Sequence, residues 1–245
     1  MKALNKKDMQ VAILCGGRGL RFKEYTDAMP KPLVPIGGRP LLWHIMRYYE
    51  EFGFRKFVLC LGYMGNEIKN YFTDDNPRKW TITFADTGLE TNTGGRIKKI
   101  EKHIGGDVFM ATYGDGLSEI DLDELVEFHR AKGRIATLTS VRPHSTFGLV
   151  HIDGEGLVTS FDEKPILDHW INGGFFVFDR KIFGYLDEND VLEKKPFVRL
   201  AQERQLAAFK FKGFWKCLDT YKDHQEFNDL WTKGNSPWAR WLDKE

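Results

Sequence analysis

The chain has 245 residues, enough to bury a full hydrophobic core, and its 36 basic side chains nearly balance 35 acidic ones. The resulting net charge of +1 excludes a broad electrostatic surface for nucleic acid or an anionic membrane, so we expect any bound anion to be held locally. No apolar run is long enough to span a bilayer, and no long apolar region follows the charged first residues. We therefore predict a cytoplasmic protein with neither nucleic-acid nor membrane partners.

Short β-branched and aromatic runs alternate with helical patterns through the first half of the chain. Strands are expected at residues 11–16, 56–63, 80–86 and 108–115, and helices at residues 40–53, 66–72 and 95–104. The first strand, VAILC, is apolar at every position and must be buried on both faces. This alternation predicts a parallel sheet that helices cover, with right-handed crossovers between its strands.

The second half continues with a helix at 121–133, a strand at 135–141 and a hairpin at 148–165 that turns at Asp153 and Gly154. Because a hairpin is antiparallel, it predicts a mixed sheet. We expect an α/β fold with a Rossmann-like, mixed and mainly parallel sheet flanked by helices. No internal repeat or linker is present, which favours a single domain over residues 1–245.

The end of the chain combines a helical pattern, ended by Gly234, with a tryptophan-rich tail. We assign residues 9–224 to the core of the predicted domain and residues 225–245 to this C-terminal helix and tail. Large apolar side chains at a chain end usually cover a core or a subunit interface, which suggests a homo-oligomer. The tryptophans are Trp231, Trp238 and Trp241.

The chain contains three cysteines, Cys15, Cys60 and Cys217. They lie far apart and lack the spacing of metal ligands, which gives little support to a disulfide framework or a zinc site. We predict reduced and mostly buried thiols.

A glycine-rich turn directly follows the first strand. Gly16, Gly17 and Gly19 have no Cβ atom, so backbone N–H groups there can approach phosphate oxygens closely. The loop lacks the Gly-Lys-Ser/Thr ending of a Walker loop and the GxGxxG spacing of dinucleotide folds. On the glycines alone, a plain turn at a strand end is an equal alternative.

Two cations that follow the loop favour phosphate binding. The Arg21 guanidinium and the Lys31 ammonium could neutralise several charges on a polyphosphate. Pro30 and Pro32 flank Lys31 and restrict the directions in which its ammonium can point. Together with the glycines, these residues predict a binding site for a polyphosphate.

Two aspartates are candidate metal ligands. Asp115 lies in the run Tyr113-Gly114-Asp115-Gly116 after the strand VFMAT, and α/β sheets bind ligands at the carboxyl ends of their strands. Mg²⁺ typically takes one or two carboxylates together with substrate phosphates. Asp219 follows a short apolar strand and is the candidate second ligand. The alternative is that Asp219 and Thr220 only cap the next helix.

A third cluster combines Glu163 and Lys164 of FDEKP with Asn172 and Gly173 of INGG. A carboxylate, an ammonium and an amide at glycine-containing turns are the groups needed to bind sugar hydroxyls and a monophosphate. Each of these groups alone is common in proteins.

Taken in this order, the residues resemble the sugar-1-phosphate nucleotidylyltransferases, and most closely the glucose-1-phosphate cytidylyltransferases. The resemblance covers essentially the whole chain, through LCGGRGLRF, MPKPLVPIGGRPLLWHIM, LGYMGNEIKNYF, ADTG, TGGRIKKI, YGDG, FDEKP, INGGFFVF, FWKCLDT and SPWARW. PIGGRPLLWHIM, TGGR and INGGFFVF, followed by the late Asp-Thr pair, point to the cytidylyl branch.

The resemblance implies a nucleotide-diphospho-sugar transferase fold and the reaction of CTP with a sugar 1-phosphate, with Mg²⁺ as the cofactor. The sugar phosphate oxygen attacks the α-phosphorus of CTP in line, and a CDP-sugar and pyrophosphate form. Because a phosphate monoester is already an anion, positioning and charge stabilisation suffice for catalysis. The expected product is CDP-glucose or a related precursor of surface polysaccharide.

The resemblance also implies a role for each candidate residue. Arg21 would hold the departing pyrophosphate and Lys31 would neutralise charge around the α-phosphate, both as catalytic residues. Asp115 and Asp219 would bind Mg²⁺. The expected nucleotide-binding residues are Leu14, Gly16, Gly17, Gly19, Gly94, Gly95, Arg96 and Gly114, and the expected sugar-phosphate residues are Glu163, Lys164, Asn172 and Gly173.

Three departures from the family pattern leave the acceptor open. Leu20 stands where the family commonly has a hydroxyl side chain, Met29 stands where cytidylyl members commonly have a second lysine, and the segment between Phe72 and Asp86 is shorter. The alternative acceptor is a different sugar phosphate or a small non-sugar phosphate. A further alternative is a non-catalytic nucleotide-binding regulatory homologue, although a protein that only senses its ligand would not need both carboxylates.

Overall fold

A seven-stranded sheet forms the centre of the molecule in this computed structural model, which describes residues 6, 8–19 and 28–242. In order across the sheet, its strands are β12 (Leu206–Lys210), β8 (Ala136–Val141), β11 (Ile171–Asp179), β6 (Val108–Tyr113), β1 (Gln10–Leu14), β4 (Lys56–Leu61) and β5 (Thr81–Asp86). Strand β11 is antiparallel to both of its neighbours, and every other pairing is parallel. The predicted mixed, mainly parallel sheet is confirmed.

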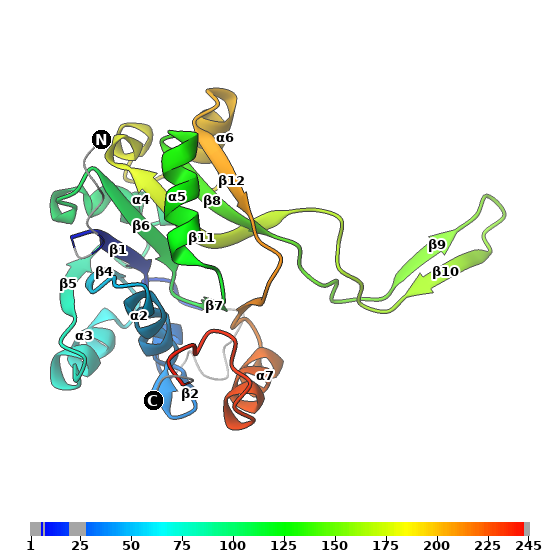
Figure 1. The fold of residues 1–245 in the computed structure, drawn as a ribbon, viewed down its shortest axis with the longest axis horizontal. Helices are drawn as coiled ribbons and strands as arrows, with labels where there is room; N and C mark the ends of the chain where they lie inside the picture. Colours follow the sequence, from blue (N-terminus) through cyan, green and yellow to red (C-terminus); the bar gives the residue numbers. More distant parts are fainter. Residues whose placement is uncertain (1–5, 7, 20–27, 243–245) are drawn as a thin grey trace.

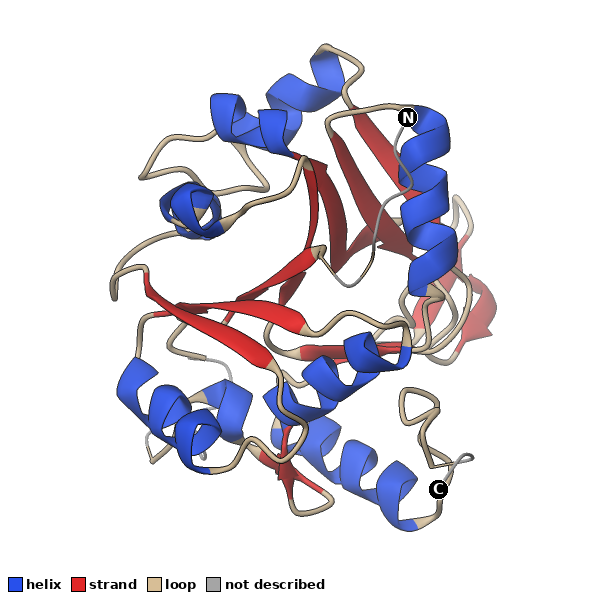
Figure 2. Cartoon of the chain, turned by 60° about the vertical axis from the view of Figure 1, so that its left-hand side comes forward, coloured by secondary structure: helices blue, strands red, loops and turns tan. Residues whose placement is uncertain are grey.

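Helices cover both faces of this sheet (Figure 2). They are α2 (Leu41–Glu51), α3 (Gly65–Asp74), α4 (Thr93–Lys99), α5 (Leu122–Lys132), α6 (Lys195–Gln202) and α7 (Tyr221–Thr232), with short 3-10 turns η2 (Lys31–Leu33), η3 (Glu101–His103) and η4 (Arg180–Tyr185). Within the described ranges, no helix is long and apolar enough to cross a membrane. The sequence patterns did not reveal β11, β12 or α6.

Each face of the sheet carries its own hydrophobic core. Along β1, Val11 and Ile13 belong to one buried cluster and Ala12 belongs to the other. This alternation follows from the period of two in a strand, and it explains why β1 is apolar from Val11 to Leu14. Cys15 and Cys60 are free, buried thiols, as expected, and burial raises the pKa of Cys60 to about 12.

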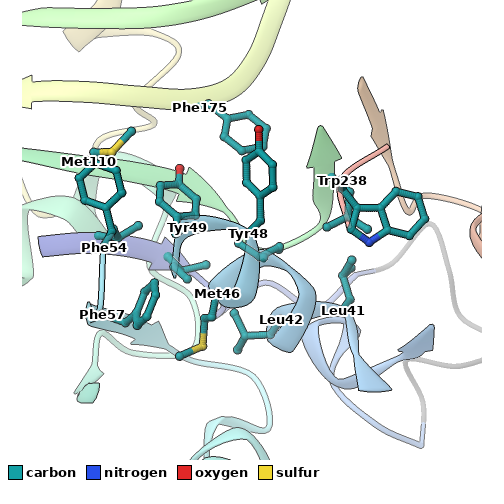
Figure 3. Packing of buried hydrophobic residues seen from close by; sticks show 14 of the residues in the cluster. Leu41, Leu42, Met46, Tyr48, Tyr49, Phe54, Phe57, Met110, Phe175 and Trp238 are labelled. Atoms are coloured by element: carbon teal, nitrogen blue, oxygen red, sulfur yellow. The ribbon is translucent and has the colours of Figure 1, made fainter. Parts of the chain in front are cut away.

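Helix α2 supplies much of the larger core (Figure 3). Its first residue follows Pro40, whose extended backbone ends the preceding strand. Apolar side chains on one stripe of the helix then pack onto the sheet, since residues three and four apart share a helix face. Figure 3 labels ten members of this cluster, which are Leu41, Leu42, Met46, Tyr48 and Tyr49 of α2 together with Phe54, Phe57, Met110, Phe175 and Trp238.

The tryptophan-rich tail covers the core of its own chain. Trp238 and Trp241 are both buried, and both belong to the cluster around α2. The indole Nε1 of Trp238 donates to Nδ1 of His44 at 3.3 Å, while Nε2 of His44 lies 2.8 Å from the carbonyl oxygen of Ile36. A neutral His44 with its proton on Nε2 satisfies both bonds.

Two buried histidines predict that stability falls with acidification. Burial lowers the pKa of His44 and of His129 from 6.5 to about 4. Above pH 6.5 both states leave these groups neutral, whereas between pH 6.5 and 4 only the unfolded chain takes up the protons, so stability is lost as pH falls. The loss of stability per histidine, complete below pH 4, is on the order of 3 kcal/mol.

Urea unfolding at pH 7, 6 and 5 measures this loss. His129→Gln should weaken the fall in unfolding free energy below pH 6.5, whereas Val198→Gln, a non-titrating change at an exposed position, should leave it unchanged. If the two variants showed the same pH dependence of unfolding free energy, buried His129 would not be a source of the acid sensitivity.

Three two-stranded sheets complete the fold. They pair β2 (Pro35–Ile36) with β3 (Arg39–Pro40), β7 (Gly116–Ser118) with β13 (Trp215–Cys217), and β9 (Leu149–Ile152) with β10 (Val158–Asp162). The β9–β10 hairpin is the one expected at 148–165, but it does not join the central sheet. It projects from the body as an arm (Figure 1), and the antiparallel member of the central sheet is β11 instead.

Candidate active site

The site lies where the order of the central sheet changes direction. Strands β4 and β5 follow β1 on one side, while β6 lies on its other side, so the loops after β1 and β6 diverge from one edge. The N–H of Gly114, just after β6, donates to the carbonyl oxygen of Leu14 at the end of β1, at 3.2 Å. A Cβ atom at Gly114 would lie 2.8 Å from that oxygen, so the close approach requires glycine.

The pairing of β7 with β13 brings the two candidate carboxylates together. Gly116 lies opposite Cys217, and the N–H of Leu218 donates to the carbonyl oxygen of Asp115 at 2.8 Å. Asp115 immediately precedes β7 and Asp219 closely follows β13, so the antiparallel pair places them side by side.

Thr220, and not Asp219, caps helix α7. The Thr220 hydroxyl and the Asp223 carboxylate form a reciprocal capping box at the first turn of the helix. The side chain of Asp219 is thereby directed to a different contact.

That contact is the ammonium of Lys31. Its Nζ lies 2.9 Å from Oδ2 of Asp115 and 2.9 Å from Oδ1 of Asp219, and the lysine side chain is only 9% exposed. Pro30 and Pro32 surround Lys31 in the η2 turn, as expected, and fix the backbone from which the side chain extends. Burial alone would lower the pKa of Lys31, but Asp115 and Asp219 outweigh it and raise that pKa above its usual value.

A cleft of about 450 Å³ opens beside this lysine. One wall is the glycine loop after β1, and the facing wall is the loop between β5 and α4. Its lining residues are Gly17, Arg18, Gly19, Lys31, Leu89, Glu90, Thr91, Asn92, Arg96, Asp115 and Asp219. The structure thus brings Lys31, both aspartates and two of the loop glycines to one cavity.

Arg96 reaches this cleft from α4 and is deeply buried. Its guanidinium donates to the carbonyl oxygens of Gly16, Leu61, Gly88 and Leu89 and to the hydroxyl of Thr87, at 2.7 to 3.1 Å. These donors are therefore engaged by the protein itself. The nucleotide contact expected for Arg96 remains a prediction.

Gly94 and Gly95 stand at the start of α4, outside the set of residues that line the cleft. A Cβ at Gly95 would lie 2.0 Å from the carbonyl oxygen of Glu188, and a Cβ at Gly94 would lie 2.8 Å from that of Asp190. Close packing against this segment explains both glycines. Their expected contact with the nucleotide remains a prediction.

Asn172 and Gly173 lie at the start of β11, next to the loop that carries Asp115. The Asn172 amide donates to the Tyr113 hydroxyl at 3.0 Å and accepts from the N–H of Gly174 at 2.9 Å. The carbonyl oxygen of Gly173 accepts from Nε1 of Trp215 at 2.7 Å. These hydrogen bonds fix Asn172 and Gly173 beside the loop that carries Asp115, although neither residue lines the cleft.

Glu163 and Lys164 are placed elsewhere, at the base of the arm. They form an exposed ion pair with Nζ and Oε1 at 3.0 Å, and neither lines the cleft. Met29 packs against the larger core. The predicted catalytic Arg21 and its neighbour Leu20 lie outside the described residues.

Sequence reasoning missed an ion pair across the mouth of the cleft. Arg18 Nη2 and Glu90 Oε1 lie 2.5 Å apart, with one residue on each wall. The motif ADTG before Glu90 indicated the loop that carries this glutamate. Nothing in the sequence pattern indicated its partner, because Arg18 and Glu90 are 72 positions apart.

This geometry defines an α/β protein built to hold a polyphosphate: a glycine loop at the switch point of the sheet faces a buried lysine and two carboxylates. The chain belongs to the Nucleotidyl transferase family, which it matches over residues 10–234. Enzymes of this family generally use a divalent metal ion.

Curated relatives refine this assignment. The chain is 42% identical to the "Probable glucose-1-phosphate cytidylyltransferase" of Bacillus subtilis and 39% identical to the glucose-1-phosphate cytidylyltransferase of Salmonella typhi, covering 95% of this chain and 100% of each relative. Among solved structures, HddC from Yersinia pseudotuberculosis complexed with GMP-PN is similar with a TM-score of 0.72 and 26% identity, covering 91% of this chain and 99% of that one. A UDP-glucose pyrophosphorylase shares the fold, with a TM-score of 0.72 at 17% identity.

Proposed function

We propose that the protein transfers CMP from CTP to a sugar 1-phosphate, with glucose 1-phosphate as the first candidate, and forms a CDP-sugar and pyrophosphate. The observation that carries the proposal is the buried Lys31 ammonium, held 2.9 Å from both Asp115 and Asp219 beside the glycine loop. The activities named for the two cytidylyltransferase relatives support CTP as the donor and glucose 1-phosphate as the acceptor. The CDP-sugar would serve as an activated precursor of surface polysaccharide.

Asp115 and Asp219 fit a divalent ion. They offer hard oxygen donors on neighbouring backbone segments, and part of each carboxylate is exposed to the cleft. In the part of the chain that the structure describes, no three such ligands cluster, so this pair would hold Mg²⁺ together with substrate phosphates, as that ion prefers. When bound there, Mg²⁺ would offset the negative charge of the nucleotide phosphates.

The chain's own residues then position the reactants. Gly17, Gly19 and Lys31 line the same cleft, so the backbone of the two glycines would receive the triphosphate and the Lys31 ammonium would neutralise charge that builds up around the α-phosphate. An oxygen of the sugar phosphate forms a new bond to the α-phosphorus, while the bond from that phosphorus to the bridging oxygen breaks and pyrophosphate leaves with the electron pair. No proton has to move, so the site needs no general base.

Pyrophosphate release tests the proposal. The purified protein is given glucose 1-phosphate and Mg²⁺ with each of CTP, UTP, dTTP, ATP and GTP, and the CTP reaction is repeated with EDTA in place of the metal. We expect release with CTP and its loss with EDTA. Preference for another nucleotide would overturn the choice of CTP. If no pyrophosphate is released with any of the five nucleotides, either with glucose 1-phosphate or with a panel of other phosphate acceptors, the protein is a non-catalytic homologue.

The arm supports our proposal that the protein is a homo-oligomer. Every residue of β9 and β10 is exposed, and an isolated hairpin is marginally stable in water. Eight apolar side chains of the arm are 38% to 77% exposed: Phe147, Leu149, Val150, Ile152, Leu157, Val158, Phe161 and Ile166. Together they expose on the order of 800 Å², the area that each partner buries in a standard interface. The proposed occupant of this surface is a second copy of the chain.

A charge on the arm is expected to dissociate the oligomer. Ile152 lies directly opposite Val158 on the hairpin, so Ile152→Asp would bury a carboxylate in the proposed interface. Light scattering after size exclusion should show a monomer for this variant. The control is Val198→Asp, at an exposed apolar position on α6, which should keep the oligomer. A monomeric unaltered protein would refute the proposal.

A further inference from the structure

Arg96 connects the two walls of the cleft. Through its Nη2 it donates to Gly16 of the glycine loop at 3.0 Å and to Leu89 of the facing loop at 3.1 Å. Through its Nη1 it donates to Leu61, Thr87 and Gly88. One planar group therefore fixes the end of β1, the end of β4 and the loop after β5 relative to one another.

The glycines beside the guanidinium have a different role from the glycine that faces the cleft. A Cβ at Gly16 would lie 2.0 Å from Nη1 of Arg96, and a Cβ at Gly62 would lie 2.6 Å from the same atom. A Cβ at Gly17 would meet no atom of the described residues within 4 Å. Gly16 is thus glycine because the arginine occupies the space beside it, whereas among the described residues no neighbouring atom requires glycine at position 17.

We propose that Arg96 is a positioning residue: it sets the separation of the glycine loop from the loop at Thr87–Asn92, and so the fit of the cleft to the triphosphate. The inference rests on the proposed function, because it takes a nucleotide as the occupant of the cleft. In this inference Arg96 does not contact the nucleotide itself; it holds Gly16, and through Gly16 it positions the loop that faces the nucleotide.

The chemistry of the side chain fits this role. A guanidinium presents its N–H donors in a rigid plane and can hold several carbonyl oxygens at fixed angles, whereas a lysine ammonium is a single point of charge on a flexible stem. Charged donors also make stronger hydrogen bonds than neutral ones. A shift of about 1 Å in the loop would suffice to lower the reaction rate substantially.

The test compares five single variants, one of which is a control, and one double variant. CTP affinity is measured by calorimetry without acceptor, thermal midpoints by fluorescence, and initial rates by pyrophosphate release. Arg96→Met should weaken CTP binding by about tenfold or more and Arg96→Lys by less, with a smaller change in the KM for glucose 1-phosphate. The control is Arg180→Met, which removes donors to the carbonyl oxygens of Ile104 and Glu101 far from the cleft and should lower only the thermal midpoint.

The two loop glycines separate packing from ligand contact. Gly16→Ala should lower both the thermal midpoint and CTP affinity, whereas Gly17→Ala should lower CTP affinity at an unchanged midpoint. In the Arg96→Met background, Gly16→Ala should add little further loss, because the guanidinium that it would displace is absent.

An Arg96→Met variant that loses stability but binds CTP as the unaltered protein does would overturn the inference. The inference would also fail if Gly16→Ala lowered CTP affinity as much in the Arg96→Met background as in the unaltered protein. Should Arg96→Met fail to fold, the same criteria apply to Arg96→Lys. If the unaltered protein neither binds nor uses CTP, the proposed function fails instead, and the variants are judged with the nucleotide that it does bind.

Discussion

Lys31→Met is expected to lower turnover by about 10²–10³-fold. The substitution removes a buried positive charge that contacts two carboxylates and faces the phosphates of the proposed substrate. It also leaves Asp115 and Asp219 facing each other without the ammonium, so the thermal midpoint should fall. Because a divalent ion between the carboxylates would replace the lost charge, Mg²⁺ should raise the midpoint of the variant more than that of the unaltered protein.

Pyrophosphate release and thermal unfolding with and without Mg²⁺ measure both effects. The matched control is Lys195→Met, which removes an exposed ammonium that pairs with Asp187 at 2.9 Å. Exposed pairs contribute little, so both activity and midpoint should stay close to those of the unaltered protein. Full activity of Lys31→Met would remove the lysine from the catalytic site.

Asp115→Asn is expected to lower turnover by roughly two to three orders of magnitude while CTP binding is partly retained. The amide oxygen can still accept from Lys31, so the local structure should persist, but the negative charge that would hold the metal is lost. Asp219→Asn should behave in the same way, since both carboxylates bond the same ammonium.

The control for the aspartates is Asp153→Asn at the tip of the arm, where the carboxylate accepts from the N–H groups of Glu155 and Leu157. Rates at saturating CTP and calorimetric CTP affinities should separate the variants: turnover falls only in the two site variants. Unchanged turnover in Asp115→Asn would show that this carboxylate is no metal ligand.

Neighbouring residues in the sequence made much of the site predictable. The glycine loop follows a strand that is apolar from Val11 to Leu14, and Asp115 follows a second, mostly apolar strand, so local pattern alone places both at the carboxyl edge of a parallel sheet. Lys31 could be singled out because the two flanking prolines restrict its backbone. These features depend on strand period and backbone stiffness, which act over a few residues.

The placement of Asp219, of Arg96 and of the arm depends on contacts distant in sequence. Asp219 meets Lys31 across 188 positions only because β7 pairs with β13, and the short strands themselves give no sign of that partner. The hairpin pattern at 148–165 was correct, but a strand pattern does not state which sheet the strand joins, and here β9 and β10 pair only with each other. The sequence patterns also missed β11, whose glycines weaken its strand signal.

The sequence by itself determined the class of fold, the position of the glycine loop and the identity of the charged residues, because hydrophobic period and backbone restriction are local properties. Tertiary structure alone decided which of those charges meet. It directs the Arg96 guanidinium to backbone oxygens, and it places Glu163 and Lys164 on an exposed arm. Burial and long-range strand pairing set these outcomes, since each depends on what the rest of the chain packs against a residue.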